Sequence, residues 1–472
     1  MNPRNIETVP LSEKSIDEFL TVLEDGGRTR LEGSLSSAAQ LLDGRVLWNI
    51  NSTAQGGGVA EMLDSLLPYM RGGQIDTRWN VVKGDGEFFA ITKRIHNMLH
   101  GDCGDGGELG AAERATYEAV LEHSGAELCE LAQPADVVIL HDPQTAGLTA
   151  ALKAHGASVV WRSHIGIDRP NEYTELAWQF LLPYLEGVDA FIFSRNAYVP
   201  EALAGRKIFI IQPSIDPHSH KNRLTSVEVA AAKVAEAGLI ADASVDVRIN
   251  PNGEETLLTG PPVELDGQPL VVQISRWDRL KDHLGVMQGF AEYVLPRHKA
   301  QLILAGPAAS GVADDPEAAE NLEQLFSAWR ELPADARAQI HIACLPMDDI
   351  NENAAIVNAL QTRADIIIQK SLAEGFGLTV SEAMWKGKPV LASGVGGIAD
   401  QIEDGLSGVL LSDPIDKAEF GEKLVALLED PAGSQAIGAQ ARIRVRDNFL
   451  HDRQIAEHAE LIAALLAAEP AA

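Results

Sequence analysis

The sequence predicts an α/β protein built on two parallel β-sheets, each with helices on both faces. Short runs of β-branched and aliphatic residues alternate along the chain with longer segments of helical periodicity, a pattern typical of strand–helix units around a buried parallel sheet. The runs fall into two sets, separated by a segment rich in Asp, Gly, Pro and Asn. A chain of 472 residues also exceeds the usual size of one hydrophobic core. Two sets of strands in a chain of this length predict two domains.

The strands are expected where the apolar runs are short and end in turn residues. The first set comprises residues 45–50, 137–140, 158–162, 190–194 and 207–212. The second set comprises residues 270–275, 301–305, 339–344, 365–369 and 390–393, with 408–411 as a weaker sixth run. A strand that is buried on both faces shows such a continuous apolar run rather than strict alternation.

The domain borders follow from these two sets. We expect an N-terminal domain over residues 1–240, a linker or insertion over 241–268, a C-terminal domain over 269–440 and a helical segment over 441–472. A helix over 226–237 leads into the linker, and a short strand candidate lies within it at 256–259. The C-terminal helical segment has packing as its simplest role, and a crossing back onto the first domain is the alternative.

The composition excludes several classes of partner. The chain has 38 Lys and Arg residues against 68 Asp and Glu residues, a formal charge of −30, which repels nucleic acid and anionic membrane surfaces. Any phosphate-binding site must therefore be locally basic. Three widely spaced cysteines favour neither disulfides nor a zinc site and fit a reducing compartment. The polar N-terminal stretch lacks the apolar core of a signal peptide, and no apolar run approaches the roughly 20 residues of a membrane span. We expect a cytoplasmic protein.

A glycine run follows the first expected strand. Residues 55–58 read Gln-Gly-Gly-Gly, and Gly57 and Gly58 precede an expected helix. Glycines at a strand end let the backbone approach a ligand, and the helix start offers free N–H groups to a sugar or phosphate. The run matches neither common nucleotide-binding glycine motif, so an ordinary flexible turn is the alternative.

A basic pair follows the first strand of the second set. Arg276 can contact two phosphate oxygens at once, and Lys281 adds a compact positive charge, so together they suit a diphosphate. The alternative is a pair of surface salt bridges to Asp278 or Asp282.

Two glutamates flank a glycine-rich stretch after the strand at 365–369. Glu374 and Glu382 enclose Gly375, Phe376, Gly377 and Leu378 at the start of an expected helix. Carboxylates accept hydrogen bonds from sugar hydroxyls, and a helix N-terminus attracts an anion. If Glu382 were only a favourable first-turn acid, Glu374 and both glycines would stay unexplained.

Polar residues also follow two strands of the first set. His141, Asp142 and Gln144 come after the strand at 137–140, and His164 comes after the strand at 158–162. Ligands collect at such strand ends in open α/β sheets, although a single histidine there is more often a packing or turn residue. The glycine loop at 394–397 repeats the strand-end arrangement in the second set.

The residues collected so far resemble a known family. Arg276 with Lys281, and Glu374 with Glu382 in an E-x7-E spacing, resemble the donor-binding signature of the family-4 retaining glycosyltransferases. Four segments are similar to the trehalose synthase branch: HDPQ at 141–144, WRSHI at 161–165, PSIDP at 213–217 and EGFGLTVSEAMWKGKPV at 374–390. The resemblance implies the GT-B fold, with two Rossmann-like domains facing a central cleft and a C-terminal helix crossing back.

The resemblance also implies an activity. Members of this branch make trehalose from a nucleotide diphosphate glucose and glucose, with retention of anomeric configuration and without a metal or other cofactor. Retaining trehalose phosphorylases, which use glucose 1-phosphate, share much of the pattern but are longer. A different small sugar acceptor, a sugar nucleotide epimerase and a binding-only protein are further alternatives. The donor base, whether of ADP-, UDP- or GDP-glucose, and a homodimeric assembly both stay open.

Roles of single residues follow from the resemblance alone. It implies catalytic roles for Arg276, Lys281, His164 and Glu374, with Arg276 and Lys281 on the diphosphate and Glu374 on the donor hexose. Glu382 holds the ribose hydroxyls. The remaining expected contacts are Gly375, Phe376, Gly377, Leu378, Gly57 and Gly58 for the donor, and His141, Asp142, Gln144 and His164 for the acceptor. The leaving phosphate oxygen is expected to take the acceptor proton, without a dedicated protein base.

Overall fold

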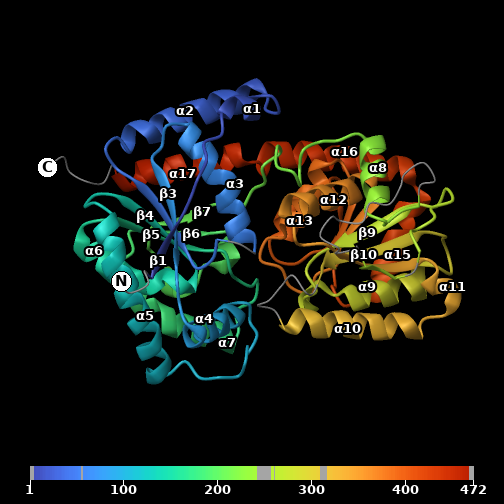
Figure 1. Cartoon of the computed structure of the whole chain (residues 1–472), viewed down its shortest axis with the longest axis horizontal. Coiled ribbons are helices and arrows are strands. Elements are labelled where there is room, and N and C mark those ends of the chain that lie inside the picture. The colour runs from blue at the N-terminus through green and yellow to red at the C-terminus, as the bar shows by residue number, and fades with distance from the viewer. Residues whose placement is uncertain (1–4, 55–56, 242–256, 260, 309–315, 467–472) are drawn as a thin grey trace. The chain divides into compact units, whose positions relative to one another are not determined.

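The computed structural model describes residues 5–54, 57–241, 257–259, 261–308 and 316–466. The chain divides into two compact units (Figure 1). Unit 1 consists of Met1–Asp216 and Phe449–Ala472, and unit 2 consists of Pro217–Asn448. Among the described residues, no helix is both long and apolar enough to cross a membrane.

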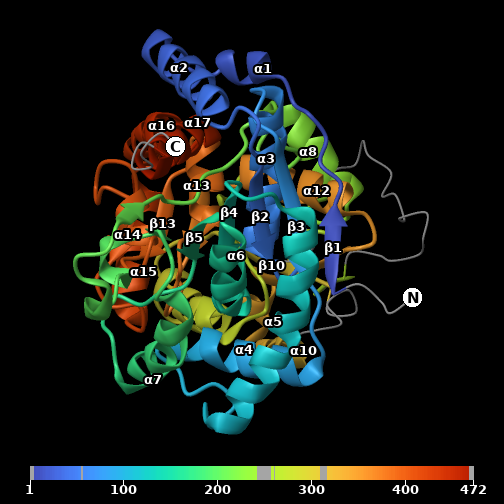
Figure 2. The ribbon, with the colours of Figure 1, turned by 90° about the vertical axis from the view of Figure 1, so that its left-hand side faces the viewer.

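Unit 1 is built on a seven-stranded sheet in the order β1-β3-β2-β4-β5-β6-β7. Neighbouring strands in this sheet pair in parallel, except that β1 runs antiparallel to β3 at the edge (Figure 2). The strands are β1 (Ile6–Val9), β2 (Leu47–Asn51), β3 (Thr77–Val82), β4 (Val137–His141), β5 (Ser158–Ser163), β6 (Ala190–Phe193) and β7 (Ile208–Ile210). The helices are α1 (Ile16–Leu20), α2 (Asp25–Leu41), α3 (Gly58–Gly72), α4 (Gly86–Leu99), α5 (Ala111–Leu131), α6 (Thr149–His155), α7 (Glu172–Leu181) and α17 (His451–Leu466), with the short 3-10 helix η1 (Pro143–Leu148) after β4.

The two faces of this sheet differ in chemistry. Side chains alternate between the faces along each strand, so that Trp161 enters an apolar core with α4, α5 and α7 while Arg162 faces the other way. There the Arg162 guanidinium meets His458 on α17, and α17 also packs against α2 (Figure 1). The fold thus places a polar layer on the sheet face covered by the C-terminal helix.

Unit 2 contains the second seven-stranded sheet, in the order β14-β13-β12-β9-β10-β11-β8. All its pairings are parallel except that of β8 with β11. The strands are β8 (Leu257–Leu258), β9 (Leu270–Ile274), β10 (Gln301–Pro307), β11 (Ile340–Leu345), β12 (Ile366–Gln369), β13 (Val390–Ser393) and β14 (Val409–Leu411). The helices are α8 (Val227–Glu236), α9 (His283–Gly289), α10 (Pro316–Glu331), α11 (Ala334–Arg337), α12 (Ile350–Arg363), α13 (Leu378–Trp385), α14 (Ile398–Gln401), α15 (Lys417–Glu429) and α16 (Pro431–Asn448), with the short 3-10 helix η5 (Arg279–Lys281) after β9.

The division of the chain differs from the border expected at 241–268. Residues 217–240 belong to unit 2, because α8 packs on α12 and the turn before α8 is hydrogen-bonded to α12 and α13. Most of the expected linker, residues 242–256 and 260, lies outside the described residues. The strand candidate at 256–259 corresponds to β8, which pairs with β11.

The C-terminal helical segment also differs in its limits. The expected border at 440/441 falls inside α16, and the chain passes between the units at Asn448 and Phe449. Helix α17 belongs to unit 1, so the crossing back onto the N-terminal domain is confirmed. Two strands, β1 and β3, were not predicted, because β3 mixes Arg78 and Asn80 with its apolar residues and β1 is a short edge strand.

Candidate active site

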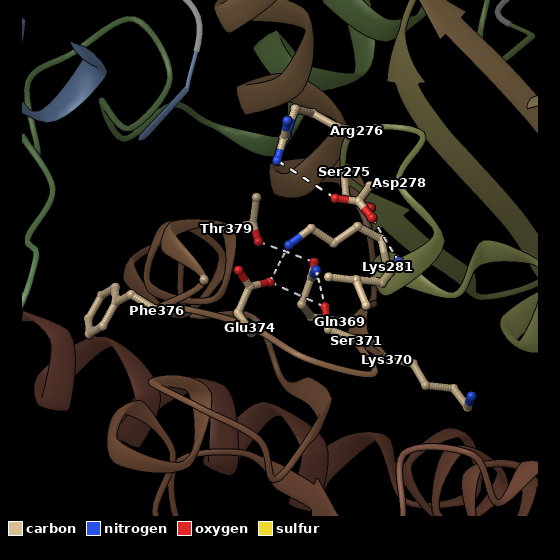
Figure 3. Close-up of polar contacts among 12 residues, drawn as sticks. Ser275, Arg276, Asp278, Lys281, Gln369, Lys370, Ser371, Glu374, Phe376 and Thr379 are labelled. Carbon is tan, nitrogen blue, oxygen red and sulfur yellow. Dashed lines mark hydrogen bonds and ion pairs between the residues drawn. The ribbon is translucent and has the colours of Figure 1, made fainter. Parts of the chain in front are cut away.

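The residues of unit 2 that were predicted to bind a donor lie at the carboxyl ends of two adjacent strands. Strands β9 and β12 pair in parallel, so the loops that follow them meet at one edge of the sheet. The loop after β9 carries Arg276 and Lys281, and the loop after β12 carries Glu374 and leads into α13. Figure 3 shows these side chains converging at that edge.

Lys281 and Glu374 form an ion pair at the centre of this cluster. The Lys281 Nζ lies 2.5 Å from Glu374 Oε2, and the two side chains are only 14% and 12% exposed. Ser371 Oγ donates to the same oxygen at 3.2 Å (Figure 3). In a largely buried pair of this kind, each side chain compensates the other's lost hydration. The structure therefore brings together two residues that the sequence analysis assigned to one ligand.

Buried side chains from the sheet hold this pair in place. Gln273 on β9 donates through Nε2 to the Lys281 carbonyl at 2.8 Å. Gln369 on β12 donates through Nε2 to Ser371 Oγ at 3.0 Å, and Thr379 Oγ1 donates to Gln369 Oε1 at 3.1 Å (Figure 3). These two glutamines were not predicted as part of the site. The available signal was a polar residue inside an otherwise apolar strand.

Arg276 occupies the same strand end but is much more exposed. Its side chain is 59% exposed, and its Nη2 lies 3.9 Å from Asp278 Oδ2. An exposed pair at that separation contributes little, so the salt bridge to Asp278 does not account for this arginine. The other expected partner, Asp282, instead forms an ion pair with the buried Lys370.

The glycine stretch between the two glutamates is tightly fitted. Gly377 has a φ of +83° and is the N-cap of α13, which has no side-chain cap among the described residues. A Cβ at Gly377 would lie 3.1 Å from Glu374 Cγ, and the N–H of Gly397 donates to the Gly375 carbonyl at 3.1 Å. The loop at 394–397 thus supports the glycine stretch, and a helix N-terminus such as that of α13 attracts anions.

Glu382 lies inside α13, beyond its first turn, and its side chain is 3% exposed. Lys221 Nζ lies 3.5 Å from its Oε1. A favourable interaction of a first-turn acid with the helix dipole therefore does not explain this glutamate. Lys221 was not predicted as part of the site.

The residues of unit 1 that were predicted to bind an acceptor gather at the ends of β4 and β5. His141 Nδ1 and His164 Nε2 are 3.0 Å apart, and His141 Nε2 lies 3.1 Å from Asn49 Oδ1. Since an amide oxygen only accepts, His141 donates to Asn49 and its Nδ1 accepts from His164. Burial lowers the pKa of both histidines well below the ordinary value, and the charge of Arg162 lowers it further. Both rings are therefore neutral at physiological pH.

Asp142 connects these two strand ends. Its Oδ1 accepts from the His164 N–H at 2.8 Å, and its own N–H donates to the Arg162 carbonyl at 2.8 Å. Its φ is +64°, an uncommon backbone conformation for a residue other than glycine, and one that clusters at functional sites. Burial raises the pKa of Asp142 to about 7, while the hydrogen bond from His164 and the charge of Arg162 oppose that shift.

Arg162, near the end of β5, is a further buried polar residue for which no role was predicted. It is fully buried, and its Nη1 and Nη2 donate to His458 Nε2 and to the Ile211 carbonyl, both at 3.2 Å. Burial lowers the pKa of Arg162 to about 9. A charged residue inside an apolar strand was the available signal, whereas its partner His458 could not be identified from the strand.

The remaining predicted residues lie near the same edge of unit 1. Gln144 is half-buried in η1. Gly57 has a φ of +88° at the N-cap of α3, and a Cβ there would have open space around it. Glycine is therefore favoured at 57 by its backbone conformation. Gln55 and Gly56 lie outside the described residues, so the ordinary turn stays an alternative for this loop.

Comparison with known proteins places the chain in a family. Residues 49–200 match the family model for the N-terminal domain of trehalose synthase, and residues 261–444 match the model for glycosyl transferases group 1. The trehalose synthase of Rubrobacter xylanophilus is 33% identical over 463 residues, which cover 98% of this chain and 99% of that protein. The trehalose phosphorylase of Grifola frondosa is more distant, at 26% identity, and the alignment covers 95% of this chain but 61% of that protein.

A solved structure supports the fold. The UDP-forming α,α-trehalose-phosphate synthase from Burkholderia vietnamiensis superimposes with a TM-score of 0.63 at 15% identity, covering 89% of this chain and 98% of that one. At that identity the likeness establishes the architecture, with two parallel-sheet units as in GT-B enzymes. Taken with the near-full-length relative, it shows that the chain belongs to the trehalose synthase family of glycosyltransferases.

Proposed function

We propose that this enzyme transfers glucose from a nucleotide diphosphate glucose to glucose, with retention of anomeric configuration, and so forms trehalose. The observation that carries the proposal is the Lys281–Glu374 ion pair, 2.5 Å long, at the edge where β9 and β12 end and α13 begins. A diphosphate and a hexose together offer the complementary groups for these two charges. The family membership supports the choice of reaction.

On the donor side, the proposal assigns the diphosphate to Arg276, Lys281 and the N-terminus of α13. Two cations and the positive end of a helix stabilise negative charge that grows on the departing diphosphate. Glu374 and the backbone of the glycine stretch hold the hexose hydroxyls, and Glu382 accepts from the ribose hydroxyls. When the donor binds, its charged and hydroxyl groups replace the ion-pair partners that Lys281 and Glu374 provide for each other.

On the acceptor side, the proposal assigns the second sugar to His164, Asp142 and Gln144. The neutral His141–His164 pair offers hydrogen bonds without adding a charge to the site, and Asp142 accepts from a sugar hydroxyl. The bond between the anomeric carbon and the phosphate oxygen breaks, and a bond from the acceptor hydroxyl oxygen to that carbon forms on the same face. The hydroxyl proton passes to the leaving phosphate oxygen, so no protein base is needed.

A donor-by-acceptor panel tests this function. Purified enzyme is incubated with ADP-, UDP- and GDP-glucose and with glucose or other small sugars, and the released nucleotide and the anomeric linkage of the product are measured. The expected product is the α,α-1,1-linked disaccharide. A parallel incubation of trehalose with inorganic phosphate or with a nucleoside diphosphate separates phosphorolysis from reversal of the transfer. Glucose 1-phosphate formation without any transfer from nucleotide sugars would replace the proposal with the phosphorylase reaction.

The panel should be repeated with and without a chelator. We expect equal rates, because Arg276, Lys281 and the start of α13 supply the positive charge that a metal ion supplies in other transferases. A rate that is lost with the chelator and restored by a divalent cation would contradict this part of the proposal.

A further inference from the structure

The partner of Glu382 comes from a distant part of the chain. Lys221 lies in the turn at 219–223, before α8, and its Nζ is 3.5 Å from Glu382 Oε1. The glutamate is 3% exposed and the lysine 23% exposed. The carboxylate is thus buried and faces an ammonium group that reaches it from outside the motif to which Glu382 belongs.

The turn that carries Lys221 is fixed by buried hydrogen bonds on both sides. Asn358 on α12 donates through Nδ2 to the His220 carbonyl at 3.1 Å and to the Arg223 carbonyl at 2.9 Å. Trp385 on α13 donates through Nε1 to the Asn222 carbonyl at 3.1 Å. Asn358, Asn222 and Trp385 are all buried. The position of the Lys221 backbone is therefore set by hydrogen bonds from α12 and from α13, the helix that carries Glu382.

A second lysine, Lys386, also contacts Glu382, but it binds the main chain and not the carboxylate. Its Nζ donates to the Glu382 main-chain carbonyl at 3.2 Å and lies 3.5 Å from Asn222 Oδ1. Burial lowers the pKa of Lys386 to about 7, with Glu382 opposing and Lys221 adding to that shift. Near neutral pH, Lys386 is therefore only partly charged. Lys221 is the lysine that contacts the carboxylate oxygen itself.

A buried carboxylate needs both a compensating charge and fixed hydrogen-bond partners to keep one orientation. The Lys221 ammonium group lies on the Oε1 side of the carboxylate, and an ionised carboxylate has acceptor positions on both of its oxygens. A neighbouring pair of hydroxyl groups, as on a ribose, offers two donors to such a carboxylate.

We infer that Lys221 is a positioning residue of the donor site, which holds the Glu382 carboxylate in the orientation that accepts hydrogen bonds from the ribose hydroxyls of the nucleotide. This inference rests on the proposed function, because that function assigns the ribose to Glu382. It adds to the donor site a cation from the turn before α8, remote in sequence from Arg276 and Lys281.

The test compares nucleotide binding with and without the ribose hydroxyls. Affinities for ADP, UDP and GDP are measured by titration calorimetry, and the tightest ligand is then compared with its 2′,3′-dideoxy counterpart. The variants are Lys221→Ala, Lys221→Met, Lys221→Arg, Glu382→Gln and the double variant Lys221→Ala/Glu382→Gln. Lys233→Ala is the matched control, since Lys233 in the same unit pairs with Glu352 on α12 rather than with the donor site.

Lys221→Ala should weaken binding of the ribonucleotide about tenfold, the usual scale for a hydrogen bond to a charged group, and leave the dideoxynucleotide almost unchanged. Lys221→Arg should restore most of the loss. Glu382→Gln should show the same selective loss, and the double variant should be no weaker than the worse single variant, because the two residues act as one unit. The Lys233→Ala control should bind both nucleotides as the wild type does.

An equal loss of affinity for both nucleotides, or no loss for either, would overturn the inference. Lys221→Met keeps the aliphatic stem, so it replaces Lys221→Ala in the same comparison if the alanine variant fails to fold. Binding is measured without turnover, so its outcome is independent of the transfer panel. If the wild type transfers glucose while the Lys221 variants keep the wild-type preference for the ribonucleotide over the dideoxynucleotide, this inference is removed and the proposed function stays intact.

Discussion

The polar clusters of the two units handle buried charge in opposite ways. In unit 2, acidic and basic side chains meet in pairs, as in Lys281 with Glu374 and Lys221 with Glu382. In unit 1, the buried groups at the strand ends are two neutral histidines and a carboxyl whose pKa is raised to about 7, beside one buried arginine. Ion pairs can be exchanged for the charges of a ligand, whereas neutral groups bind an uncharged sugar without leaving a charge unpaired. The difference fits the proposed binding of a charged donor by unit 2 and of an uncharged acceptor by unit 1.

The largest predicted effect is on turnover, and it should come from removing Lys281, the cation of the ion pair in unit 2. Lys281→Ala should lower the turnover number about a hundredfold or more, because one charge contact to the departing diphosphate is lost. Steady-state kinetics with saturating donor and acceptor measures it. Lys417→Ala is the control, since that lysine pairs with Glu292 at a distance of 3.5 Å elsewhere in unit 2. Near-normal turnover in both Lys281→Ala and Arg276→Ala would remove the leaving-group argument.

The second predicted effect is on stability, and it concerns Arg162, the buried arginine on β5 of unit 1. Arg162→Met should lower the free energy of unfolding by about 2–3 kcal/mol, because His458 Nε2 and the Ile211 carbonyl lose their donors inside the protein. Denaturant titration measures the change. Arg206→Met is the matched control, as Arg206 also donates to main-chain carbonyls, those of Glu186 and Val188, but is only half-buried. If both variants lose the same free energy of unfolding, burial of Arg162 does not make the loss of its hydrogen bonds more costly.

These two effects also mark what the sequence can and cannot predict. The resemblance to a known family predicted that Lys281 and Glu374 share a site. Each follows an apolar run, and parallel strands that end at one edge of a sheet explain why they meet. Arg162 and His458 are 296 positions apart, and no local pattern indicates that α17 covers the sheet face on which Arg162 lies. The same holds for Lys221, which the sequence analysis placed in the other domain. Local periodicity determines elements, but contacts between remote segments depend on how the elements pack.

The border between the units was misplaced for a similar reason. The segment 241–268 has the composition of a linker, and this composition predicted the border. The structure joins residues 217–240 to unit 2 through hydrogen bonds from Asn358 and Trp385 to the main chain of the turn. The sequence of that turn is polar and gives no sign of which core it packs against.

The third predicted effect concerns ligand affinity. It tests whether the Lys281–Glu374 ion pair is exchanged for ligand contacts on binding. Glu374→Gln should raise the dissociation constant of the nucleotide sugar about tenfold, because a charged hydrogen bond to the hexose is lost. The free nucleoside diphosphate should bind as tightly as before or more tightly, because Lys281 no longer has to leave Glu374. Calorimetry with both ligands measures the contrast. Weaker binding of both ligands by the same factor would show that the ion pair is not exchanged on binding.

The smallest effect is a dependence of stability on pH that arises from Asp142. The pKa of Asp142 is raised to about 7 in the folded protein, whereas an unfolded aspartate has a pKa of about 3.9. Between these values the folded state holds a proton that the unfolded state has released, so this contribution to stability is fully present below pH 4 and is lost as the pH rises through 7.

Asp142→Asn removes that titration. The melting temperature of the wild type, relative to Asp142→Asn, should therefore fall between pH 5 and pH 8 by about 2–4 °C or more, the usual scale for 1 kcal/mol in a domain of 150–250 residues. Asp189→Asn serves as the control, because Asp189 pairs with Lys153 in the same unit and is a third exposed. A difference that stays constant across this range, or that grows with pH, would mean that Asp142 is ionised throughout. The cluster at the ends of β4 and β5 would then carry a fixed negative charge, and its contrast with the paired charges of unit 2 would have to be abandoned.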